Sequence, residues 1–107
     1  MVSIIIPEII KLGAHSYRLS FDPHLWQDED KSGLTHHRLQ EINIELAVPP
    51  SNRDETLLHE VLHIIDLLYR CRLNEDDIER LAQGLADFLF NNLEITLDWS
   101  NIPVKQR

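Results

Sequence analysis

Cysteine, basic residues and long apolar runs are scarce in this 107-residue sequence, and each scarcity excludes a class of protein. The single cysteine, Cys71, cannot form an internal disulfide, which fits a reducing compartment. Ten basic residues against 18 acidic ones give a net charge of −8. This balance argues against nucleic acid as the main partner, because phosphate binding needs clustered Lys and Arg. No apolar run approaches the roughly 18–20 residues that would span a bilayer.

The first residues also lack the features of a signal peptide. Residues 1–7 contain no basic residue, and Pro7 ends their short apolar run. Together with the missing disulfide and the missing membrane span, this predicts a cytoplasmic protein with neither a membrane nor a nucleic acid as partner.

The overall composition is that of a globular domain. Hydrophobic residues make up 43% of the sequence and charged residues 26%. A chain of this length fits a single domain spanning residues 1–107. So small a domain buries only about two-thirds of its unfolded surface, and a bound metal would add useful stability.

Residues 1–48 read mostly as β structure. Apolar residues alternate with polar ones at 17–21 and again at 39–47, which is the period of a half-buried strand. With the apolar residues near the N-terminus, this predicts a small antiparallel or mixed sheet of about three strands. Residues 22–33 read as a loop, and Trp26 and Trp99 are expected to cover the small core.

Residues 51–91 read as two helices, so the fold class is α+β. Ser51 is a suitable N-cap for a helix that runs to about Arg70. Asn74 and Asp77 have the spacing of a capping box for the second helix. Residues 92–107 form a tail that could pack on the body or cover a site.

The first helix carries the motif His59-Glu60-Val61-Leu62-His63, the H-E-x-x-H pattern. Residues four apart lie one turn above each other, so both imidazoles can reach one ion. The glutamate beside the first histidine can then act as general base on the water that the metal activates. The two histidines share the polar stripe of a helix whose remaining surface is a wide apolar arc, and this favours a metal site over a merely solvated face.

A catalytic zinc normally has three protein ligands and one open position. Asp66 lies on the same helix face, but three ligands from successive turns of one helix converge poorly on a tetrahedral ion. Asp66 is therefore predicted to orient a histidine ring or to pair with Arg70. Glu79, near the start of the second helix with small alanines beside it, is the predicted third ligand. Glu75 is predicted to be an ordinary acidic residue of the helix's first turn.

Residues 56–63, Asp66 and residues 79–86 together resemble small gluzincin-type metallopeptidases. They are similar to the compact phage and prophage relatives of the ImmA/IrrE family and to the minigluzincins. The resemblance covers about residues 34–92, and its specific core is the pair of helices.

This resemblance implies a sheet packed on an active-site helix, with zinc held by His59, His63 and Glu79 and with Glu60 as general base. It also implies that the strand near 39–46 is the sheet edge to which an extended peptide substrate could add.

The sequence thus predicts a zinc metallopeptidase that cleaves a peptide or protein substrate. Two other classes stay open: a latent or inactive metalloprotein, and a protein-interaction module that keeps the peptidase fold. A donor for the oxyanion is also required. Four residues are candidates by type, but the sequence places none of them: Tyr17, His36, His37 and Tyr69.

Overall fold

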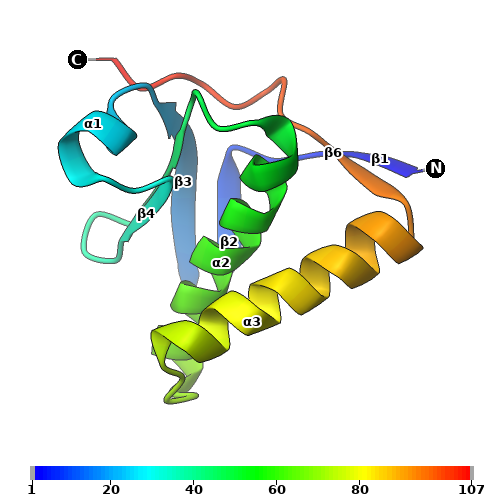
Figure 1. Cartoon of the computed structure of the whole chain (residues 1–107). Helices are drawn as coiled ribbons and strands as arrows, with labels where there is room; N and C mark the ends of the chain where they lie inside the picture. The colour runs from blue at the N-terminus through cyan, green and yellow to red at the C-terminus, as the bar shows by residue number, and fades with distance from the viewer. Residues whose placement is uncertain (1, 107) are drawn as a thin grey trace.

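The computed structural model describes residues 2–106, and the terminal residues Met1 and Arg107 lie outside the described part. A four-stranded mixed sheet in the order β2-β3-β5-β4 lies at the centre of the fold (Figure 1). β3 pairs with β2 in antiparallel and with β5 in parallel orientation, and β4 pairs antiparallel with β5. The strands are β2 (Ile9–Leu12), β3 (His15–Asp22), β4 (Gly33–His36) and β5 (Glu41–Glu45).

The predicted third strand, β5, is an internal strand and not the edge of the sheet. It lies between β3 and β4, so no peptide can add to it. The two edges are β2 and β4. β4 could not be predicted from the sequence, because its four residues show no alternation of polar and apolar side chains. β5 is buried on both faces: Ile42 and Ile44 enter the core, while Asn43 accepts a hydrogen bond from the Ser20 hydroxyl at 3.0 Å.

A short helix, α1 (Leu25–Glu29), occupies part of the segment that was expected to be a loop. Leu25 is buried, but Trp26 is 59% exposed, so the prediction that Trp26 covers the core is wrong. The backbone N–H of Trp26 donates to the buried Glu45 carboxylate at 2.9 Å, which ties α1 to the end of β5.

Two long helices complete the second half, as predicted. α2 (Pro50–Tyr69) begins with a proline at its first position and not at a Ser51 cap, because the fixed φ of proline suits the first turn and its missing N–H would be unpaired there anyway. α3 (Glu75–Ala86) has the predicted capping box of Asn74 and Asp77 and continues into a π-helical turn, η1 (Asp87–Asn92).

α2 packs on the sheet through the main cluster of the hydrophobic core. Its buried Leu57 and Ile64 pack with strand residues that include Leu19, Ile42 and Ile44. α2 contacts β4 and β5 on one side and α3 on the other (Figure 1). This arrangement places the H-E-x-x-H helix between the edge of the sheet and the second helix. Within the described residues, no helix is both long and apolar enough to cross a membrane.

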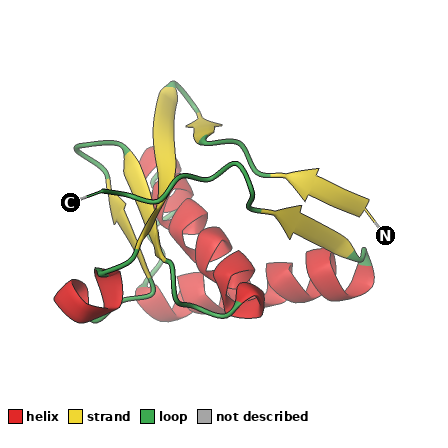
Figure 2. Cartoon of the chain, turned by 90° about the horizontal axis from the view of Figure 1, so that it is seen from above, coloured by secondary structure: helices red, strands yellow, loops and turns green. Residues whose placement is uncertain are grey.

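The C-terminal tail is an integral part of the fold. Its strand β6 (Ile95–Asp98) pairs in parallel with β1 (Val2–Ile5), and the two lie side by side, away from the four-stranded sheet (Figure 2). Beyond β6, Trp99 stacks on Phe21 with 5.4 Å between the ring centroids, and Ile102 is buried in the core. The Phe21 backbone then pairs with the chain at 103–105.

Candidate metal centre

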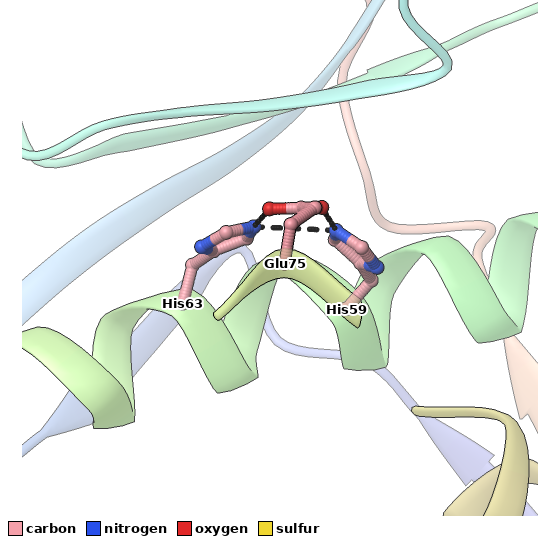
Figure 3. A group of neighbouring side chains, drawn as sticks. All are labelled: His59, His63 and Glu75. Carbon is pink, nitrogen blue, oxygen red and sulfur yellow. Dashed lines mark hydrogen bonds and ion pairs between the residues drawn. The ribbon is translucent and has the colours of Figure 1, made fainter. Parts of the chain in front are cut away.

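His59 and His63 point from one face of α2 toward the first turn of α3 (Figure 3). Their Nε2 atoms are 3.2 Å apart, and both side chains are partly buried. The two imidazole nitrogens therefore lie close enough together for one ion to contact both, which is the arrangement expected from the i, i+4 spacing.

The carboxylate of Glu75, predicted from the sequence to be an ordinary acidic group of the first turn, completes the group. Glu75 Oε1 lies 2.7 Å from His59 Nε2, and Glu75 Oε2 lies 3.1 Å from His63 Nε2 (Figure 3). The three ligand atoms lie within 4.8 Å of one another. The only signal in the sequence that could have indicated Glu75 is its position as the first residue after the Asn74 cap, where the chain returns toward α2.

The linker between α2 and α3 fixes the position of Glu75. α2 ends at Tyr69 with Arg70 as its C-cap, and both Arg70 and Arg72 adopt positive φ values, of 53° and 59°, which reverse the chain direction. Asp66 Oδ1 accepts a hydrogen bond from the backbone N–H of Leu73 at 2.9 Å, next to the Asn74 cap. Among the described interactions the Asp66 carboxylate pairs with neither histidine ring nor the Arg70 guanidinium, although the Asp66 carbonyl accepts the Arg70 backbone N–H. In this structure the Asp66 carboxylate holds the linker.

Glu79, the predicted third ligand, lies one turn after Glu75 on α3 and lines the same cleft. Ala82, which follows it on α3, is buried and lines the same cleft. Glu79 is not among the three donors that are within metal-ligand distance of one another. Its role as a ligand stays a prediction.

Glu60 lies beside the donor group and is only 7% exposed. Its Oε1 accepts a hydrogen bond of 2.7 Å from the Thr35 hydroxyl on β4. The second oxygen, Oε2, has no hydrogen-bond partner among residues 2–106, and Glu60 lines the cleft. Gly33 allows β4 this close to α2, because a Cβ there would lie 2.6 Å from Thr56 Cγ2 and 3.1 Å from Glu60 Oε2.

These residues line a cleft of about 660 Å³ between β4 with the loop before it, α2 and the start of α3. His37 is the one candidate oxyanion donor among Tyr17, His36, His37 and Tyr69 that lines it. The Tyr17 hydroxyl lies 3.3 Å from His37 Nδ1, and burial raises the pKa of this phenol, which keeps it protonated at neutral pH. Of the described tail residues 93–106, none lines the cleft, so the tail does not cover it in this structure.

The donor set fits a divalent metal ion. Two imidazole nitrogens and a carboxylate oxygen are ligand types of catalytic zinc sites, in which donors about 2.0–2.2 Å from a tetrahedral ion lie about 3.3–3.5 Å from one another. The separation of 3.2 Å between the two Nε2 atoms is close to this value. The contacts of 2.7 and 3.1 Å to Glu75 involve two different carboxylate oxygens and have the length of hydrogen bonds, and one oxygen together with both Nε2 atoms forms a group within 4.8 Å. Without an ion, the same three side chains make a hydrogen-bonded link between α2 and α3.

Comparison with family models, with curated proteins and with solved structures gives no match for this chain.

Proposed function

We propose that this chain is a zinc-dependent metallopeptidase related to the gluzincins. One observation carries the proposal: His59, His63 and Glu75 converge within metal-ligand distance, and the buried Glu60 of the same motif lines the same cleft. We propose Glu75 as the third ligand on the basis of these distances, with Glu79 as the alternative from the sequence.

The roles of the chain's own residues follow from their positions. When bound, zinc would lower the pKa of a water molecule and polarise the scissile carbonyl. Glu60 takes a proton from the attacking water through its unpartnered Oε2 and passes it to the leaving amine. Thr35 holds the other oxygen of Glu60 in place. His37 can donate to the oxyanion from the cleft wall.

The zinc content of the purified chain tests this proposal. We expect one zinc per chain by mass spectrometry after chelator-free purification, and loss of most of it in His63→Ala. Glu75→Gln should weaken zinc binding about 10–100-fold or more, because it removes a charged ligand.

Glu79→Gln is the matched variant, since it makes the same change one turn along α3. If zinc is lost in Glu79→Gln and kept in Glu75→Gln, Glu79 is the third ligand. If the parent binds no zinc even when zinc is supplied, the metallopeptidase proposal is wrong, and the histidine–glutamate group only links the two helices.

Thr35 is expected to act as a positioning residue for Glu60. Thr35→Val keeps the shape of the side chain but removes the hydrogen bond, and such bonds to charged groups are worth about 1.5–3 kcal/mol. We expect kcat for a peptide substrate to fall about tenfold or more, with zinc content unchanged. Thr35→Ser retains the hydroxyl and should restore most of the rate; equal losses in both variants would contradict the positioning role.

The two other classes predict different results in the same assays. An inactive metalloprotein would bind zinc without cleaving any peptide, and an interaction module would bind a partner without needing zinc. Latency caused by the tail has no structural support, because no described tail residue lines the cleft.

A further inference from the structure

The cleft carries more negative charge than a divalent ion can neutralise. One cation, Lys31, lines it together with five carboxylates: Asp30, Glu55, Glu60, Glu75 and Glu79. With zinc bound and the histidines neutral, the lining keeps a net negative charge. A ligand that carries positive charge is therefore favoured over a neutral or acidic one of the same shape.

Three of these carboxylates are free to meet such a ligand. Asp30, Glu55 and Glu79 form no ion pair with any other residue in the described range 2–106. Glu55 lies one turn before His59 on α2, and Glu79 lies one turn after Glu75 on α3. Acidic groups therefore continue beyond the metal-ligand group along both helices.

The Glu60 carboxylate in the same cleft is only partly satisfied by the protein. Glu60 is more than nine-tenths buried and its Oε1 accepts from Thr35, but its Oε2 accepts no hydrogen bond from the described residues. Oε2 is not among the fully enclosed polar atoms that lack a partner, so it stays open to the cleft. A ligand in the cleft can therefore reach this oxygen.

The cleft wall opposite α2 and α3 contains an aromatic ring, that of Trp26. Trp26 lines the cleft and is 59% exposed, although its backbone is held by Glu45. The backbone N–H of Asp30 donates to the Trp26 carbonyl at 3.0 Å, so the two residues belong to one turn, and both line the cleft. An exposed indole and a carboxylate in one cleft are suited to a Lys or Arg side chain, through cation–π attraction and charge pairing.

From these observations we infer that the cleft selects peptide segments bearing Lys or Arg side chains, with Trp26 and Asp30 on one wall and Glu55 and Glu79 on the other. This rests on the proposed function for the statement that the bound peptide is a substrate. The net charge of −8 on the whole chain acts in the same direction, since it attracts cationic peptides at long range.

A binding assay tests the inference separately from cleavage. The zinc-loaded full-length chain with Glu60→Gln is titrated against two fluorescein-labelled peptides of Ala and Gly, one with two central Lys and the other with two central Gln. We expect the Lys peptide to bind about tenfold more tightly, and its advantage to shrink as salt is raised.

Variants then identify the groups responsible. Glu55→Gln combined with Asp30→Asn, and separately Trp26→Leu, should each reduce the preference for the Lys peptide several-fold. Glu29→Gln is the control, because it removes the same charge next to Asp30 from a residue that does not line the cleft. Equal affinities for the two peptides, or no binding of either at millimolar concentration, would overturn the inference.

The two proposals fail in different ways. If the Lys peptide binds preferentially but the parent chain hydrolyses neither peptide, the peptidase proposal is refuted and the proposed preference for cationic side chains is supported. If both peptides are hydrolysed at equal kcat/KM, the peptidase proposal is supported and the proposed preference is refuted.

Discussion

Glu60→Gln should lower the rate of peptide hydrolysis by about 10²–10⁴-fold, the usual contribution of a general base. The reason is that the amide cannot take the proton of the attacking water. The fold should be unaffected, because the amide oxygen can still accept the hydrogen bond from Thr35 and the side chain has nearly the same shape. Zinc binding should also be kept, since Glu60 is not one of the three converging donors.

The measurement is kcat/KM on a fluorogenic peptide, with zinc content and thermal unfolding recorded on the same samples. Glu29→Gln serves as the control for the change in net charge. A Glu60→Gln variant that binds zinc and cleaves at the parental rate would show that Glu60 is not the base and that the proposed mechanism is wrong.

Removal of residues 93–107 should abolish the folded state instead of releasing activity. The deletion removes β6 together with Ile102, and loss of one buried isoleucine side chain alone costs about 2–5 kcal/mol. It also removes Trp99, which packs on Phe21 and donates a 2.7 Å hydrogen bond to Asp54. Because domains of this kind are stable by only about 5–15 kcal/mol, these losses together approach or exceed the total.

Circular dichroism during heating distinguishes the outcomes. The truncated chain, which lacks residues 93–107, should show no cooperative unfolding transition. The point variant Ile102→Ala should unfold cooperatively, at a lower temperature than the parent. Asn101→Ala, at an exposed neighbouring position, is the control and should match the parent. A truncated chain that stays folded and gains peptidase activity would contradict this prediction and would establish the tail as an inhibitory segment.

The sequence by itself determined the features that depend on local periodicity. The i, i+4 spacing of His59 and His63 required only that residues 50–69 be helical, and the apolar arc of that segment made it so. The capping box at Asn74 fixed the start of α3 in the same local way. The α+β class follows from the alternation at 17–21 and 39–47 together with the helical pattern of residues 51–91.

Other features depended on contacts between distant segments, and only the tertiary structure decided them. β4 has no pattern of its own and exists because it pairs with β5 and packs on α2 through Gly33. Glu75 meets the histidines because two positive-φ arginines and the Asp66–Leu73 hydrogen bond set the angle at which α3 returns along α2. A shift of α3 by one turn along its axis would bring Glu79 to the place of Glu75. No sequence periodicity distinguishes the two residues, since carboxylates four apart share one helix face and only the linker geometry selects between them.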